Sequence, residues 1–414
     1  MEISLYLHIP FCLSKCDYCD FYSVPPGGSL EQWRDEGARL YVDALLAETE
    51  RRFAGLEYSV PTLYIGGGTP SLLGAAGMAR LLDGLSPKTG SCREITVEAN
   101  PETADTAFLR SCADHGVTRL SLGVQSFCPA ARKAAGRRGE LVPEHLDAAA
   151  KIFGSFLSLD LITGLPFQDA ACVLADVERA LSYNPGHISL YSLTVEQGTP
   201  LAARRAAEER PAAGDDDTLW LAGRDALIRA GYEQYEVSNF ALPGRRCAHN
   251  IRYWRMENWI GVGPAASGTM IDGPLAEVSS AGLTPDIPAG NASRGRRTGY
   301  AADTEAFLAD PSGCITVEEL DTLTLIKESL LMGFRYSEGP DRELFRRRFG
   351  LDLEAAVPRT LEKWRQMGLT RPGKTALSPR GMLLLNRFLL DCFEELSSGP
   401  SFTPDNPKAA CMSG

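Results

Sequence analysis

The chain has 414 residues, of which 44% are hydrophobic, and it carries 42 basic and 53 acidic residues for a net charge of −11. This length and composition exclude a disordered chain and allow two or three domains, one of them large. The negative charge argues against long-range attraction to nucleic acid or anionic lipid, so we expect neither as a partner.

The N-terminal segment and the cysteines indicate the compartment. Residues 1–10 lack a basic stretch followed by an apolar run, and no later run approaches transmembrane length, so no secretory signal or membrane span is predicted. Eleven cysteines are scattered irregularly, and three of them fall near the start of the chain. We therefore expect a cytoplasmic protein whose reduced thiols are available for metal ligation rather than disulfides.

Short apolar runs alternate with longer helical patterns up to about Thr194, as in repeated βα units. Buried parallel strands are expected at residues 4–9, 62–66, 94–99, 119–124, 158–162 and 187–193. We predict an α/β fold with a partial (β/α)6 barrel of the TIM type. Ligands of such barrels bind at the C-terminal ends of the strands, where this chain has polar or glycine-rich residues.

The composition divides the chain into five predicted segments. They are 1–200 (barrel core), 201–271 (barrel extension), 272–300 (Gly- and Pro-rich loop or linker), 301–395 (C-terminal domain) and 396–414 (disordered tail). The C-terminal domain is expected to be a small winged-helix module, with helices at 318–333 and 379–393 and small strands around a turn at 371–374.

Cys12, Cys16 and Cys19 form a C-x3-C-x2-C spacing in a loop after the first predicted strand. Three neighbouring thiolates can hold a [4Fe-4S] cluster and leave one iron open for a bidentate ligand such as S-adenosylmethionine (SAM). The alternative from spacing alone is a structural zinc site completed by His8 or a distant cysteine. A closed zinc site has no reason to lie at the ligand-binding edge of a barrel, so we favour the cluster.

Glycine and polar residues follow the later strands. The run Gly66-Gly67-Gly68-Thr69-Pro70 could hold the charged methionine end of SAM through its backbone, although a glycine run alone is more often a tight turn. Glu98, Gln125 and Asp160 lie near strand ends, where they could accept hydrogen bonds from ribose or amino groups, or act as caps or core polar residues. Arg137 could pair with a carboxylate or belong to a solvated basic pair with Arg138.

Five segments together carry a family resemblance. They are Tyr6-Leu7-His8-Ile9-Pro10-Phe11-Cys12 with Cys16 and Cys19, Gly67-Gly68-Thr69-Pro70, Val97-Glu98-Ala99-Asn100-Pro101, Leu122-Gly123-Val124-Gln125-Ser126-Phe127, and Asp160-Leu161 with Gly164-Leu165-Pro166. They resemble HemN-type radical SAM proteins over nearly the whole chain to about Phe393. The resemblance implies a radical SAM barrel followed by a HemN-like domain. It implies SAM contacts from Tyr6, Gly67, Gly68, Thr69, Glu98, Gln125, Arg137, Asp160 and Thr194.

Two places indicate the branch of this family. Coproporphyrinogen dehydrogenases of the family carry a fourth cysteine two residues after the third, where this chain has Phe21. The segment His249-Asn250-Ile251-Arg252-Tyr253-Trp254 is similar to the H-N-x-x-Y-W segment of HemW haem chaperones, and Gly231-Tyr232-Glu233-Gln234-Tyr235-Glu236 is also HemW-like. The resemblance therefore favours the HemW branch.

His249 is a candidate haem ligand, because imidazole can bind iron while flanking aromatic rings pack on the macrocycle. The alternative is a hydrogen-bonded histidine that orients Tyr253 and Trp254 in the core, and Cys247 is a second candidate ligand. Relatives often have histidines where this chain has Ser267 and Gly139, so no haem ligand is expected at those two positions.

The resemblance implies a chaperone that binds haem as cargo and passes it to haem-requiring respiratory proteins, supported by the cluster, SAM and an electron donor. No residue then needs to act as a general acid or base, and none is assigned as catalytic. Enzymatic activity stays open. The alternatives are an oxygen-independent coproporphyrinogen III dehydrogenase, against which Phe21 argues, and a haem-modifying radical SAM methyltransferase.

Overall fold

The structure is a computed structural model that describes residues 1–207, 216–271 and 295–397. The chain divides into two compact units, the first made of Met1–Tyr253, Glu257–Met270 and Arg297–Glu318, and the second mainly of the chain from Glu319 onward. Residues 272–294 of the predicted linker and the predicted tail beyond Ser397 lie outside the described residues.

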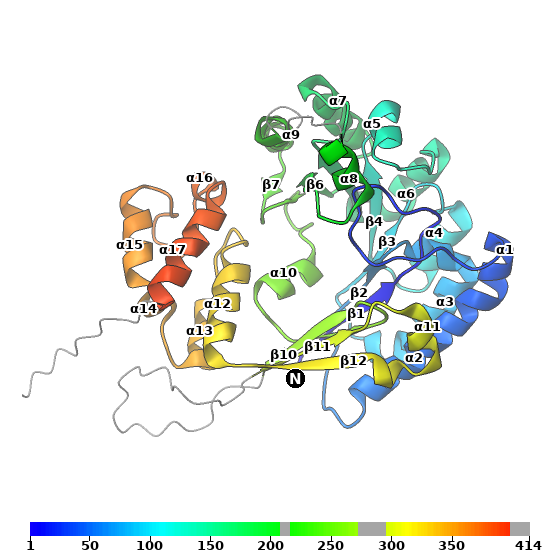
Figure 1. Ribbon diagram of the computed structural model, residues 1–414, viewed down its shortest axis with the longest axis horizontal. Helices are drawn as coiled ribbons and strands as arrows, with labels where there is room; N and C mark the ends of the chain where they lie inside the picture. The colour runs from blue at the N-terminus through cyan, green and yellow to red at the C-terminus, as the bar shows by residue number, and fades with distance from the viewer. Residues whose placement is uncertain (208–215, 272–294, 398–414) are drawn as a thin grey trace, which may run out of the picture. The chain divides into compact units, whose positions relative to one another are not determined.

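Six parallel strands form the centre of the first unit (Figure 1). They are β1 Ser4–Ile9, β2 Thr62–Gly67, β3 Glu94–Ala99, β4 Arg119–Gln125, β5 Leu157–Thr163 and β6 His187–Ser192. Each pairs in parallel with the next, from Leu5 opposite Leu63 in the first pair to Ser158 opposite His187 in the last. The six predicted strands are confirmed, with ends shifted by at most one residue.

Further strands extend this sheet on both sides. Its order is β12-β11-β10-β9-β1-β2-β3-β4-β5-β6-β8-β7, with β7 Glu233–Gln234, β8 Asn239–Ala241, β9 Trp259–Val262, β10 Ser267–Ile271, β11 Gly295–Tyr300 and β12 Ile315–Leu320. β6 pairs antiparallel with β8, and β1 pairs in parallel with β9, so β1 and β6 do not close on each other. The parallel strands therefore form the predicted partial barrel.

Helices connect the parallel strands, and Figure 1 shows α2, α3, α4 and α6 along one face of the sheet. The helices of the first unit are α1 Leu30–Gln32, a π-helical turn Trp33–Gly37, α2 Ala38–Phe53, α3 Gly74–Thr89, α4 Thr106–Asp114, α5 Pro129–Ala134, α6 Pro143–Phe153, α7 Ala170–Leu181, α8 Pro200–Ala207, α9 Asp216–Arg229, α10 Ala248–Trp254 and α11 Thr304–Ala309. Short 3-10 turns lie at Pro70–Leu73, Gly154–Phe156 and Pro311–Cys314.

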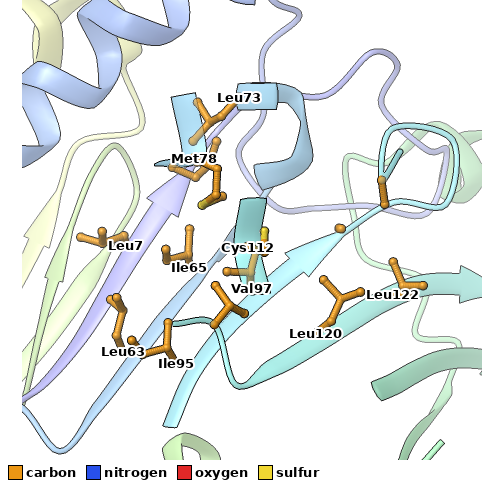
Figure 2. Close-up of a cluster of buried hydrophobic side chains, with 14 of the residues drawn as sticks. Leu7, Leu63, Ile65, Leu73, Met78, Ile95, Val97, Cys112, Leu120 and Leu122 are labelled. Atoms are coloured by element: carbon orange, nitrogen blue, oxygen red, sulfur yellow. The ribbon is translucent and has the colours of Figure 1, made fainter. Parts of the chain in front are cut away.

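The hydrophobic core lies between the sheet and these helices. Figure 2 shows Ile65 of β2, Val97 of β3 and Leu120 of β4 packed with Met78 of α3 and Cys112 of α4. Successive side chains of a strand point to opposite faces, so the residues between these apolar positions point into the barrel. Those inward residues are mostly polar, and they line the cavities described below.

The second unit consists mainly of helices, namely α12 Thr322–Gly333, α13 Arg342–Phe349, α14 Leu353–Ala356, α15 Pro358–Gln366, α16 Pro379–Met382 and α17 Leu385–Ser397. Phe334, Trp364 and Phe388 are buried at its centre, with ring centroids 4.5 Å apart for Phe334 and Phe388 and 5.0 Å apart for Trp364 and Phe388. Instead of the predicted small strands, Thr370 and Leu377 form an isolated antiparallel bridge.

Three sequence predictions in this half of the chain need correction. Residues 295–300, expected to be loop, form β11, because pairing with the neighbouring strands outweighs a Gly-rich composition. The helix expected from residue 318 begins after Asp321, whose side chain caps it by accepting from Thr324 N at 2.7 Å. The final helix expected at residues 379–393 is two helices, α16 and α17.

Within the part of the chain that the structure describes, every helix is too short or too polar to cross a lipid bilayer.

Candidate functional site

A cavity of about 410 Å³ lies where the six parallel strands end. The loops after β1 and β6 and the last residues of β2, β3, β4 and β5 all contribute to its wall. The sequence-predicted residues in this wall are Cys12, Cys16, Cys19, Gly67, Gly68, Glu98, Gln125, Arg137, Asp160 and Thr194. The structure therefore brings together residues that are up to 182 positions apart in the sequence.

Three predicted site residues lie outside the cavity wall. Thr69 is one position beyond it, and its hydroxyl lies 3.5 Å from Sγ of Cys12. Tyr6 is absent from the wall, and its hydroxyl lies 2.9 Å from Nδ1 of His8. His249 is farther away and is treated separately below.

The loop that carries the three cysteines is fixed at its base and in its middle. Cys12 N donates to Val24 O at 3.1 Å, and Val24 N donates to Pro10 O at 2.7 Å, which closes the base. In the middle, Asp17 N donates to Ala135 O at 3.0 Å, and the carboxylate of Asp17 accepts from Arg204 of α8. These contacts orient Cys16 and Cys19 independently of any metal.

The chemistry of the three sulfurs fits a cluster. Burial raises the pKa of the Cys12 thiol and raises that of Cys19 to about 11, so these thiols stay neutral unless a cation such as iron stabilises the thiolates. Among residues 1–207, 216–271 and 295–397, no three His, Cys, Asp or Glu side chains converge as ligands of a single metal ion. A [4Fe-4S] cubane would attach each thiolate to a different iron and leave the fourth iron open.

Glycine is required at the end of β2 because the His8 side chain and the backbone that follows β1 approach closely. Gly67 has φ +109°, and a Cβ there would lie 2.6 Å from the ring of His8. A Cβ on Gly68 would lie 2.7 Å from Phe11 O, next to the first cluster cysteine. The glycine run therefore packs directly against the cysteine loop, as well as facing the cavity.

Two partly buried carboxyl groups and one buried guanidinium belong to the polar part of the cavity wall. Burial raises the pKa of Glu98 to about 7, although the Tyr64 hydroxyl and Gly67 N donate to it at 2.6 and 3.0 Å. Burial also raises the pKa of Asp160, and Ser121 donates to its carboxylate at 3.0 Å. Arg137 donates to Asn100 Oδ1 at 3.0 Å, and its Nη1 lies 3.8 Å from Sγ of Cys16.

Several residues of the wall were not predicted from the sequence, notably Lys15, Asn100, Ser121 and Tyr191. Ser121 lies two residues before Gly123 in β4, and Tyr191 lies two residues after Ser189 in β6. A search for alternating polar residues within the predicted strands would have found them, because residues i and i+2 of a strand share one face. Gln125, which was predicted, adopts φ +68°, an uncommon conformation for a residue other than glycine.

His249 lies at the opposite end of the barrel, beside the first residue of β2. Its Nδ1 is 2.9 Å from Thr62 Oγ1 and its Nε2 is 2.8 Å from the Tyr253 hydroxyl, and the side chain is 0% exposed. Burial lowers its pKa to about 3, with the charge of Arg252 acting in the same direction. Cys247 is also buried, with its Sγ 3.3 Å from Glu94 Oε1. Both candidate haem ligands are therefore occupied by internal contacts.

Comparison with known sequences and structures agrees with this geometry. Residues 6–180 match the Radical SAM superfamily, and residues 320–384 match the HemN C-terminal domain. Proteins named heme chaperone HemW are 40% identical over 285 residues in Escherichia coli (strain K12), covering 66% of this chain and 72% of that one, and 34% identical over 358 residues in Lactococcus lactis, covering 85% and 86%. The solved structure of coproporphyrinogen III oxidase (HemN) from E. coli matches with a TM-score of 0.73 at 20% identity, covering 94% of this chain and 90% of that one.

A partial parallel barrel with three cysteines and a glycine run at its C-terminal edge, followed by a HemN-type C-terminal domain, defines a radical SAM protein. Within that superfamily, the identity to curated relatives over more than two thirds of their length shows that the chain belongs to the HemW family.

Proposed function

We propose that this protein is a haem chaperone that carries a [4Fe-4S] cluster on Cys12, Cys16 and Cys19 and binds SAM in the adjoining cavity. One observation carries the proposal, namely that the three cysteines open onto the same cavity as Glu98, Arg137 and Asp160. The HemW relatives are named as heme chaperones, which supports haem as the cargo. Delivery to haem-requiring respiratory proteins, reduction of the cluster by an electron donor and action in the reducing cytoplasm belong to the same proposal.

In this arrangement the cluster and SAM would supply electron transfer and radical chemistry, and the protein supplies binding and orientation. Arg137 is a buried cation suited to the carboxylate of SAM, and Glu98 and Asp160 are acceptors for its amino or ribose groups. Gly67 N donates to Glu98 Oε2 and Gly68 N donates to Ile9 O, so these glycines contribute close backbone approach at the end of β2 rather than free donors. No described residue is assigned to move a proton.

Because His249 is enclosed at the far end of the barrel, we place haem at the opening of the cavity. Phe21 lines the cavity and is 65% exposed, and Tyr191 lines it on another side, so both offer aromatic surface to a porphyrin. Lys15 also lines the cavity and can pair with a propionate group of haem. We call Phe21, Tyr191 and Lys15 the rim cluster.

The test is anaerobic haem titration of the reconstituted protein and its Phe21→Ala variant. We expect the substitution to weaken haem binding about tenfold, equivalent to ~1.4 kcal/mol, because it removes an aromatic contact. The matched control is Phe167→Ala, which removes an aromatic ring that is 74% exposed but lies outside the cavity wall. Equal affinities of the two variants would contradict the rim cluster. Multiple turnovers of coproporphyrinogen III to protoporphyrinogen IX would contradict the chaperone function itself.

SAM affinity is expected to depend on pH through Glu98. The pKa of this carboxyl group is raised to about 7, so the group is mostly neutral below neutrality and becomes an anion as pH rises. An anion attracts the sulfonium and ammonium groups of SAM, so we expect affinity to increase about tenfold between about pH 6 and about pH 8. Calorimetric titration measures this change. Glu98→Gln should bind weakly at every pH, and an unchanged pH profile in this variant would contradict the assignment.

A further inference from the structure

The interior of this barrel is polar along its whole depth. Closed (β/α)8 barrels are filled by layers of Val, Ile and Leu, whereas the six parallel strands here form a partial barrel. Here a second, smaller cavity of about 30 Å³ lies inside the strands, next to the SAM cavity. The side chains in its wall include Thr96, Arg119, Ser158 and His187, all of them buried. A polar cavity in the middle of a barrel needs a physical explanation, because buried polar groups require partners.

Two polar groups in this wall lack a protein partner among the residues that the structure describes. Arg119 is 2% exposed; it donates through Nε to Glu94 at 3.2 Å and through Nη2 to Arg245 O at 2.6 Å, but Nη1 has no partner. Thr96 is 1% exposed, and its hydroxyl also has no partner. By contrast, Ser158 and His187 contact each other at 2.7 Å.

The size and charge of the cavity restrict what can satisfy these two groups. One water needs about 10–15 Å³ of such space, so about 30 Å³ accommodates about two waters and no larger molecule. The positive charge of Arg119 disfavours a cation, and the carboxyl groups of Glu98 and Asp160 in the same wall disfavour an anion. A neutral ligand that both donates and accepts hydrogen bonds fits Arg119 and Thr96 as well as the two carboxyl groups.

We propose that the barrel interior is a binding site for about two structural waters that link Arg119 and Thr96 to the carboxyl groups of Glu98 and Asp160. Both carboxyl groups also line the large cavity, so they form the partition between the two cavities. The waters hydrogen-bond these two carboxyl groups from the small cavity and hold them in position for a ligand in the large cavity. This positioning of the carboxyl groups rests on the proposed function; the water site itself does not.

The experiment compares wild-type protein with Thr96→Val, which keeps the shape of the side chain and removes its hydroxyl. Oxygen-17 magnetic relaxation dispersion of the full chain counts long-lived buried waters, and we expect the variant to lose about one of them relative to wild type. Thr96→Ser keeps the hydroxyl and should retain the wild-type count. Thr106→Val, at an exposed position in α4, is the matched control and should also leave the count unchanged.

Equal counts for wild type and folded Thr96→Val would overturn the proposal. If Thr96→Val does not fold, a high-resolution crystal structure of the wild type decides, because the proposal requires water density within hydrogen-bonding distance of Arg119 Nη1 and a dry cavity excludes it. A second readout is SAM affinity, expected to fall about threefold in Thr96→Val and to be restored in Thr96→Ser. Unchanged affinity with a lost water would overturn the positioning role, whereas absence of SAM binding in every variant would count against the proposed function instead.

Discussion

Replacing Cys16 with serine is expected to reduce bound iron and sulfide after anaerobic reconstitution to nearly nothing. Cys16 lies between the other two ligands in a loop held by Asp17, and a serine hydroxyl is a poor ligand for cluster iron. Arg137 Nη1, 3.8 Å from the Cys16 sulfur, would then face a hydroxyl rather than a thiolate. Iron and sulfide analysis, together with the visible absorbance of the cluster, measures the effect.

The matched control for this substitution is Cys172→Ser, in the first turn of α7. Cys172 is partly exposed, like the cluster cysteines, but lies outside the cavity wall. We expect this variant to bind the same amount of iron as the wild type. Iron and sulfide at the wild-type stoichiometry in Cys16→Ser, in a protein that remains folded, would contradict the ligand assignment.

The second large effect concerns His249, which we expect to stabilise the fold without binding haem. His249→Ala removes two buried ring contacts and leaves Thr62 and Tyr253 facing a cavity, so the free energy of unfolding should fall by about 3–5 kcal/mol. Haem affinity of the folded variant should stay within about twofold of wild type. Chemical denaturation and haem titration measure the two quantities separately.

The effect of His249 on stability should also depend on pH. The pKa of the folded-state imidazole is about 3, below its value of about 6.5 in an unfolded chain, so the folded state takes up fewer protons between these values. The stabilising contribution of His249 is therefore complete above about pH 6.5 and decreases as the pH falls toward the folded pKa. The stability difference between wild type and His249→Ala should shrink over the same range. The control for both stability and haem affinity is His115→Ala, which removes a partly exposed histidine at the end of α4.

A large loss of haem affinity confined to His249→Ala would show that His249 is a haem ligand after all.

The strands and the cysteine loop could be predicted because their signals are local. A buried parallel strand is a short apolar run, and the C-x3-C-x2-C spacing lies within one loop, so neither depends on distant contacts. The cavity wall was predicted in large part because the ends of parallel strands share one edge of the sheet. Ser121 and Tyr191 were not predicted as site residues because their strands were interpreted only as buried. The polar residues that alternate with the apolar ones in these strands point into the barrel.

The position of His249 could not be predicted because it depends on contacts across the sequence. Its ring meets Thr62, which is 187 residues away, and its backbone N–H donates to Glu94, which is 155 residues away. A histidine near aromatic residues has the same local sequence pattern whether it binds iron or forms buried hydrogen bonds at the end of a barrel. The strand β11 was missed for a similar reason, since its pairing partners, rather than its composition, determine its conformation.

Mössbauer spectroscopy of the reconstituted wild-type protein, with and without SAM, tests the central claim most directly. Three thiolates facing one cavity predict about four irons per chain, with the signal of a single iron changing when SAM occupies its open position. A mononuclear metal on the three cysteines, or a cluster whose irons all remain unchanged when SAM is added, would contradict the account.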